Sequence, residues 1–154
     1  MHEPYLKQVI EMARENVRRG GGPFAALVVK DGAVIATGVN QVTRTNDPTA
    51  HAEIVALRAA CSVLASYRLT GCEIYSSCEP CPMCLGAIYW ARPVRVYFAA
   101  GHEDAAGAGF DDSFIYRQIQ IPAAERSIPM IQVEHESAVR PFEEWVNKGD
   151  RTEY

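Results

Sequence analysis

The chain has 154 residues, 48% hydrophobic and 22% charged, and this composition is that of one globular domain rather than a disordered chain. Lysine and arginine number 15 against 19 aspartates and glutamates, and the net charge of −4 disfavours a nucleic-acid partner, which requires a basic surface. Every uncharged run is well short of the about twenty apolar residues that a membrane helix needs. No apolar stretch opens the chain, so we expect a cytoplasmic protein with no membrane partner.

The first part of the chain has the pattern of a helix followed by a hairpin. Apolar residues at intervals of three and four predict a helix that begins near Pro4, and the glycines at 20–22 end it. Two β-rich runs, Phe24–Lys30 and Ala33–Val39, flank the dipeptide Asp31-Gly32, which is typical of a tight β-hairpin.

Helices and strands alternate in the rest of the chain. Two loops are predicted, at Asn40–Thr49 and Gly101–Gly109, and Asp47-Pro48 has the pattern of a capped helix start. The other predicted elements are a helix from Pro48 to Leu64, a strand at Cys72–Ser77, a helix from Pro82 that ends before Pro93, a strand at Val94–Ala99, a helix at Ser113–Ile119, a fifth strand at Met130–Glu134 and a helix at Phe142–Lys148. This order predicts an α/β fold with a mixed sheet, in which helical crossovers follow an antiparallel hairpin.

Two short fragments carry residue types that bind metals. His51-Ala52-Glu53 lies near one helix start, and Cys81 and Cys84 lie at the next one. The intervening helix is about 21 Å long, and the strand that follows it is about 20 Å long. The chain therefore returns to the edge that it left, at the carboxyl end of the strand, where open α/β sheets bind ligands.

A histidine and two cysteines form a ligand set known from catalytic zinc, which leaves a fourth position for water. Cys81 and Cys84 share one helix face and lie in a first turn, where backbone N–H groups favour thiolates. Two thiolates cancel the charge of Zn²⁺, so this zinc acidifies its water less than a three-histidine zinc does, and a nearby base is needed. Glu53 is the candidate base rather than a ligand, because two residues along a helix rotate it by about 200° from His51.

The five cysteines also permit other interpretations. A Cys-x-x-Cys pair after a strand is typical of thiol oxidoreductases, in which Cys81 and Cys84 form a redox pair. Cys78 is a possible fourth ligand, which would make the zinc site purely structural. Cys61 and Cys72 have the spacing of core residues, and an odd number of cysteines disfavours a disulfide framework.

The spacing of His51-Ala-Glu53 and Pro80-Cys81-x-x-Cys84 resembles the zinc signature of the cytidine deaminase-like superfamily. Within it, three segments are similar to the bacterial guanine deaminases: Asn46–Glu53 (NDPTAHAE), Ser77–Arg92 (SCEPCPMCLGAIYWAR) and Ala105–Phe114 (AAGAGFDDSF). The similarity extends from the first helix to the terminal Glu153-Tyr154 and so covers nearly the whole chain.

This resemblance implies a three-layer α/β/α sandwich around a mixed five-stranded sheet, with one Zn²⁺ per chain. It implies one zinc deaminase domain over residues 1–154, of which 149–154 form a tail that closes an active site, and a homodimer whose C-terminal segments can exchange. The implied zinc ligands are His51, Cys81 and Cys84, and Glu53 is the implied catalytic proton shuttle. The implied substrate contacts are Asn40, Ala52 and Asp112, with Phe24, Trp90 and Tyr154 as walls or lids.

The expected reaction is the zinc-dependent hydrolytic deamination of guanine to xanthine and ammonia, a step of purine catabolism or salvage, and the expected partner is a small purine base. A carboxylate at Asp112 suits guanine because it accepts hydrogen bonds from ring N–H donors. The zinc signature equally fits a cytosine deaminase or a tRNA adenosine deaminase, although net charge and the segment Phe110–Phe114 argue against the latter. Outside deamination, a thiol oxidoreductase and a structural-zinc domain are the alternatives.

Overall fold

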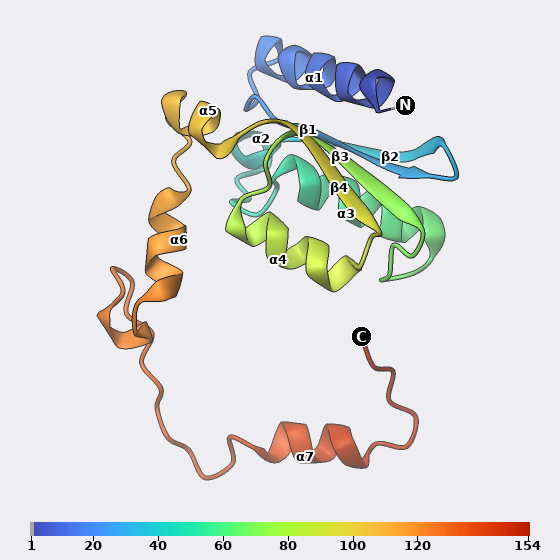
Figure 1. The fold of residues 1–154 in the computed structure, drawn as a ribbon. Coiled ribbons are helices and arrows are strands. Elements are labelled where there is room, and N and C mark those ends of the chain that lie inside the picture. The colour runs from blue at the N-terminus through green and yellow to red at the C-terminus, as the bar shows by residue number, and fades with distance from the viewer. Residues whose placement is uncertain (1) are drawn as a thin grey trace. The chain divides into compact units, whose positions relative to one another are not determined.

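The computed structural model describes residues 2–154, and the chain forms two compact units, Met1–Ser113 and Phe114–Tyr154 (Figure 1). Most of the regular structure belongs to the first unit. Its elements in chain order are α1 (Glu3–Arg18), β1 (Ala25–Lys30), β2 (Ala33–Val39), α2 (Val42–Thr45), α3 (Ala52–Leu64), β3 (Cys72–Cys78), α4 (Pro82–Ala91), β4 (Arg95–Ala100) and α5 (His102–Gly107).

The strands form one mixed sheet with the order β2-β1-β3-β4. β1 pairs antiparallel with both β2 and β3, whereas β3 and β4 are parallel. The α3 segment carries the chain from β2 to β3 and α4 carries it from β3 to β4, which confirms the predicted hairpin and helical crossovers.

Helices cover both faces of this sheet, with α1 on one face and α3 and α4 on the other (Figure 1). The alternation of side chains along β1 supplies both cores. Leu27 joins Val9 of α1 in one apolar cluster, while its neighbour Val28 joins Leu57 of α3 and Ile88 of α4 in the other. The first unit is therefore a three-layer α/β/α arrangement.

A glycine lets α3 approach the sheet closely. A Cβ atom at Gly38 of β2 would overlap the carbonyl oxygen of Ala52 and lie 2.5 Å from the backbone nitrogen of Ala56. Both alanines are buried and small, so backbone packs against backbone here. This contact fixes the first turn of α3, which carries the predicted metal-binding residues, against the end of β2.

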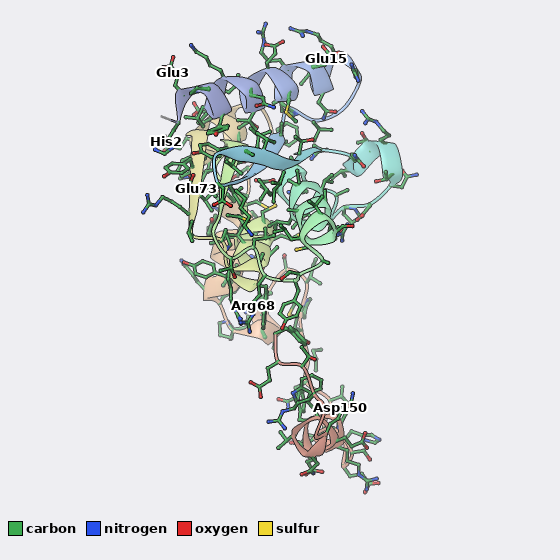
Figure 2. All side chains as sticks on the ribbon, turned by 90° about the vertical axis from the view of Figure 1, so that its right-hand side faces the viewer. His2, Glu3, Glu15, Arg68, Glu73 and Asp150 are labelled. Atoms are coloured by element: carbon green, nitrogen blue, oxygen red, sulfur yellow. The ribbon has the colours of Figure 1, made fainter. Side chains whose placement is uncertain are left out.

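An aromatic cluster fastens the beginning of α1 to the sheet. The His2 ring shares a hydrogen bond of 2.8 Å with the Tyr75 hydroxyl and stacks on Tyr97 at 4.0 Å. Both tyrosine hydroxyls donate to the Glu73 carboxylate, and His2 and Glu73 lie along the same side of the first unit (Figure 2). Burial, with the nearby Glu73 charge, raises the pKa of Tyr75 to about 12, so this hydroxyl stays protonated.

After the first residue of α6 (Ser113–Gln120), the second unit contains the rest of that helix, the 3₁₀-helix η1 (Ala123–Glu125) and α7 (Arg140–Asn147). The fifth strand predicted at Met130–Glu134 is wrong. The described residues contain a sheet of four strands, not five. The segment has β-type residues, but a strand also needs a neighbour that pairs with its backbone. Ile131 and Val133 are instead 75% and 82% exposed, and the Met130 N–H bonds to the Ala123 carbonyl of η1.

The helix predicted to begin at Pro48 begins at Ala52 instead. Asp47 does not cap a helix; its carboxylate accepts hydrogen bonds from the N–H and hydroxyl of Thr49 in a tight turn. His51 consequently takes the N-cap position of α3. The predicted loops also contain two short helices, α2 and α5.

No helix among residues 2–154 has the length and apolar character needed to cross a membrane.

Candidate metal centre and active site

The three predicted ligands lie at the beginnings of two helices that start from the same edge of the sheet. His51 is the N-cap of α3 and Cys81 is the N-cap of α4, and both have extended backbone conformations. Cys84 lies in the first turn of α4 and is fully buried. Because β3 ends at Cys78, this edge is the carboxyl end of the strand, as the lengths of the helix and the strand predicted.

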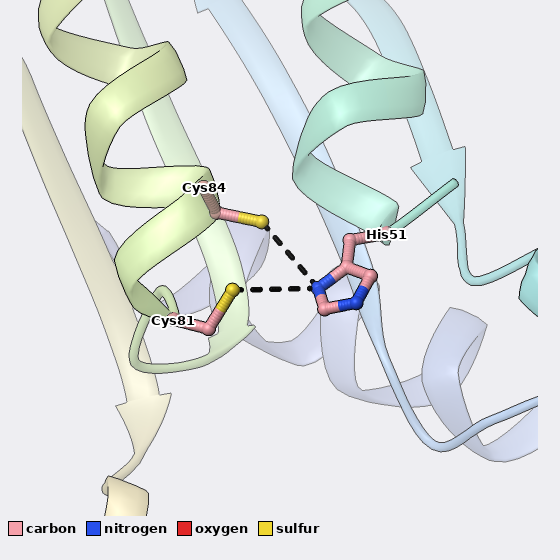
Figure 3. A group of neighbouring side chains, drawn as sticks. All are labelled: His51, Cys81 and Cys84. Carbon is pink, nitrogen blue, oxygen red and sulfur yellow. Dashed lines mark hydrogen bonds between the residues drawn. The ribbon is translucent and has the colours of Figure 1, made fainter. Parts of the chain in front are cut away.

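The three side chains converge on one point (Figure 3). The Nδ1 atom of His51 lies 3.5 Å from the Cys81 sulfur and 3.6 Å from the Cys84 sulfur, and the three donor atoms all lie within 4.8 Å of one another. Zinc bonds of about 2.05 Å to nitrogen and 2.3 Å to sulfur, at tetrahedral angles, separate the two donors by about 3.6 Å. The observed spacing and the donor types therefore fit Zn²⁺.

The two thiols differ in how readily they ionise. The contact with Cys84 lowers the pKa of the Cys81 thiol to about 4, and the contact with Cys81 raises the pKa of Cys84. The hydrogen bond with Cys81 also raises the pKa of His51. Cys81 is thus the thiol that ionises first, beside the N-terminus of α4.

Glu53 lies next to the ligands but is not one of them. The side chain is 6% exposed; its Oε1 accepts a hydrogen bond of 3.3 Å from Ser76, and its Oε2 accepts one of 3.5 Å from the Cys84 thiol. Burial raises the pKa of this carboxyl above its ordinary value. A carboxyl group with a raised pKa holds its proton more readily than an exposed one, which suits a group that acts as both general acid and general base.

The structure brings several other predicted site residues to this edge. Asn40 directly follows β2 and is buried, and its backbone N–H bonds to the Phe24 carbonyl at 3.0 Å. Ala52 is the first residue of α3 and is fully buried. Asp112 is half-buried, and burial together with the negative charge of Cys81 raises the pKa of its carboxyl.

Of the other two predicted walls, Trp90 lies away from the metal ligands. Trp90 lies in the last turn of α4 and is 64% exposed; six residues beyond Cys84, it is about 9 Å further along the helix axis. Tyr154 belongs to the second unit, where its ring meets Trp145 edge-on at 6.4 Å. The roles assigned to these two aromatics stay predictions.

The other cysteines lie apart from the three-ligand cluster. Cys78, the possible fourth ligand, directs its thiol to the Gly101 carbonyl at 3.6 Å, and burial raises its pKa to about 11. All five cysteines of the chain are free thiols. Cys72 is buried in the core, as its place in a strand predicted.

Three residues of the site were missed in the sequence. Ser76 orients Glu53, Phe110 packs edge-on against Phe24 with ring centroids 5.0 Å apart, and Asn16 bonds to the Asn40 carbonyl. Ser76 and Asn16 had a detectable signal, since each is a polar residue on the buried face of its element. Phe110 had none, because its contact joins a loop to the start of a distant strand.

A mixed α/β sheet with a His-Cys-Cys zinc centre at two helix N-termini, and a buried carboxyl group beside it, defines a class of zinc-dependent hydrolytic enzymes. The family model for the cytidine and deoxycytidylate deaminase zinc-binding region matches residues 1–100. The chain belongs to this deaminase family, and its cofactor is zinc held by His51, Cys81 and Cys84.

Relatives agree with this assignment over different lengths. The chain is 58% identical to guanine deaminase of Bacillus subtilis (strain 168), with 99% of both chains covered. The X-ray structure of Bacillus subtilis guanine deaminase matches with a TM-score of 0.98 over 100% of this chain and 99% of that chain, at the same identity. A structure of guanine deaminase from Nitrosomonas europaea is 38% identical, with a TM-score of 0.67 and coverage of 70% and 63%.

The tRNA-specific adenosine deaminase of Aquifex aeolicus is 40% identical over 98 residues, which are 64% of this chain and 65% of that protein. This match therefore ends well short of the full chain, in contrast to the match with the Bacillus subtilis guanine deaminase.

Proposed function

We propose that the protein hydrolyses guanine to xanthine and ammonia. The observation that carries this proposal is the extent of the likeness to Bacillus subtilis guanine deaminase, which includes the second unit and the terminal residues. The likeness to a tRNA-specific adenosine deaminase covers only 64% of the chain. The zinc centre is common to both activities, so the residues around it decide between the substrates.

The chemistry requires one water molecule, one proton shuttle and a leaving amine. Zinc, when bound, activates a water molecule for attack on the carbon that bears the exocyclic amine. Glu53 accepts one proton of that water and delivers it to a ring nitrogen. It then takes the remaining proton from the hydroxyl added to the base and gives it to the amine, which leaves as ammonia as the carbonyl of xanthine forms. Ser76 holds the carboxyl group in place through its hydrogen bond to Oε1. Burial favours the protonated form that this second transfer needs.

The residues around the centre offer hydrogen-bonding groups of the types that guanine requires. Asp112 accepts hydrogen bonds from ring N–H groups. The side-chain oxygen of Asn40 is occupied by the Val42 N–H at 3.2 Å, so its amide nitrogen is the group that serves a base acceptor. Ala52 presents a backbone N–H from the first turn of α3, where helical N–H groups lack partners within the helix. Phe24 supplies an apolar wall.

An ammonia-release screen over guanine, cytosine, adenine and their nucleosides tests this proposal on zinc-loaded protein. We expect guanine to exceed the other substrates in kcat/KM by at least about a hundredfold, because unpaired buried polar groups discriminate strongly. Preference for cytosine, or turnover of adenosine in a tRNA anticodon alone, would contradict the proposal and would favour one of the rival deaminases.

The proposed assembly is a homodimer whose partners exchange C-terminal segments, with residues 149–154 closing an active site. Large apolar side chains support it, because a monomer leaves them in water. In the second unit Ile131, Val133 and Phe142 are exposed, and in the first unit Tyr89 and Trp90 are exposed. The single-domain boundary at 1–154 and the cytoplasmic location also stay predictions.

Deletion of Gly149–Tyr154 is expected to lower kcat/KM for guanine by at least about tenfold, because an open site admits water and orients the base poorly. The melting temperature should change little, since these residues are exposed. Kinetics and thermal melting of the deletion variant measure both effects. Unchanged kinetics would show that the tail is not a lid.

A mixed dimer then distinguishes closure within one chain from closure across the dimer. One subunit carries Glu53→Gln with an intact tail, and the other carries Glu53 without residues 149–154. If the tail closes the partner's site, the mixed dimer regains activity, because an intact tail covers an intact Glu53. If the tail acts within its own chain, the mixed dimer is no faster than the deletion variant.

A further inference from the structure

Asn16 is a polar residue in the buried stripe of α1. It follows Val9 and Ala13 at helical spacing and is only 3% exposed. Its side-chain nitrogen donates to two backbone carbonyls, that of Gly22 at 2.7 Å and that of Asn40 at 3.0 Å. These three residues form what is called here the Asn16 bridge, which ties α1 to two segments that meet beside the candidate active site.

The two carbonyls belong to backbone segments that carry the predicted base contacts Phe24 and Asn40. The Phe24 N–H bonds to the Gly22 carbonyl at 2.9 Å, and the Asn40 N–H bonds to the Phe24 carbonyl at 3.0 Å. A continuous chain of hydrogen bonds therefore runs from the Asn16 amide through the backbones of Gly22, Phe24 and Asn40 and back to Asn16. The bridge fixes the places from which the Phe24 ring and the Asn40 side chain project.

The two glycines before β1 leave the space that the Asn16 bridge occupies. A Cβ at Gly21 would lie 2.5 Å from Asn16 Nδ2 and 2.7 Å from its Oδ1, so any side chain there displaces the amide. A Cβ at Gly22 would lie 3.1 Å from Cγ of Asn40. Arg44 donates to the Asn16 oxygen at 3.4 Å, which orients the amide with its nitrogen toward the two carbonyls.

We propose that Asn16 is a positioning residue for base binding, acting through the backbones of Phe24 and Asn40. This inference rests on the proposed function for its substrate, guanine. Asn16 contributes to KM rather than to the chemical step, because the bridge does not touch Glu53 or the zinc ligands. An amide is required at this position, since one nitrogen must donate to two carbonyls.

The test uses Asn16→Asp, which keeps the side-chain shape but replaces the donor with acceptors, and Gly21→Ala, which displaces the same amide from another segment. Val9→Ala is the matched control, because it removes buried packing from the same helix and leaves the bridge intact. Zinc content and melting temperature are measured for all three variants. If Asn16→Asp does not fold, Gly21→Ala alone tests the proposal.

Both bridge variants should raise KM for guanine by about tenfold or more, as expected for the loss of two buried hydrogen bonds, while kcat changes less than about threefold. Val9→Ala should leave KM unchanged. An unchanged KM in the bridge variants, or an equal rise in Val9→Ala, would overturn the proposal. So would a fall in kcat without a rise in KM.

Hydrogen exchange of the zinc-loaded protein without substrate separates this result from failure of the proposed function. The Asn40 amide should exchange at least about tenfold faster in the bridge variants than in the parent and in Val9→Ala. If the parent releases no ammonia from guanine, the proposed function fails, while the exchange rates still test the bridge. Equal exchange of the Asn40 amide in all these proteins would show that the Asn16 bridge does not hold the Asn40 backbone in place.

Discussion

Glu53→Gln is expected to abolish ammonia release from guanine while the protein keeps its fold and about one zinc per chain. Glutamine has the same shape but cannot take a proton from water or deliver one to the base. General acid and base catalysis by one group contributes about 10² to 10⁴ in rate, and here one carboxyl group serves successive transfers, so the loss should lie at or above the upper end. Steady-state kinetics with metal analysis measures both.

Glu79→Gln is the matched control for this loss. Glu79 lies in the same motif as the cysteines, but its carboxylate bonds to the ring and the backbone N–H of His102 at 2.9 Å and 3.3 Å, away from Glu53. This variant should keep most of its activity. If Glu53→Gln retained turnover within tenfold of the parent, Glu53 would not be the proton shuttle. If it lost zinc, Glu53 would be needed for metal binding, contrary to the three-ligand centre.

The metal centre was predictable because local rules place its parts. A Pro at the first position of α4 sets Cys81 as N-cap and Cys84 one turn further, and similar lengths of α3 and β3 return the chain to His51. The same local rules made one error here. Asp47-Pro48 reads as a helix start, but Asp47 bonds to Thr49 in a turn, so α3 begins at Ala52.

That error changed how Glu53 relates to His51. A rotation of about 200° between Glu53 and His51 requires both residues to lie within the helix. His51 is instead the N-cap with an extended backbone, so its ring and the Glu53 carboxyl both reach Cys84 from one helix start. The identity of the base stays a prediction, and the geometric reason for excluding Glu53 as a ligand was incomplete.

The features that the sequence did not show depend on distant partners. The residues at 130–134 have strand propensity, but propensity cannot say whether a neighbouring strand is present, and in the described chain none pairs with them. The Asn16 bridge joins residues far apart in the chain, so the sequence shows a polar residue in the apolar stripe of a helix but not the carbonyls to which it bonds. The predicted base contacts at Asp112 and Tyr154 depend on segments whose placement no local pattern specifies.

Cys84→Ala is expected to remove zinc from the protein. Zinc content should fall from about one per chain to below about a tenth, because the variant leaves two protein ligands where the centre has three. Guanine turnover should fall to background, since water is no longer activated. Metal analysis of protein purified without chelators, together with ammonia release, measures the two effects.

Cys78→Ala is the control. Cys78 is also a buried thiol, but it bonds to the Gly101 carbonyl and not to the three zinc ligands. It should keep zinc and activity. Loss of zinc in Cys78→Ala would revive the structural four-ligand interpretation. Parent protein that contains a Cys81–Cys84 disulfide and no metal would instead favour the thiol oxidoreductase, and mass spectrometry of alkylated protein detects this state. The two cysteine variants and the mass spectrum of the parent together separate a three-ligand centre, which leaves a coordination position for water, from both alternatives.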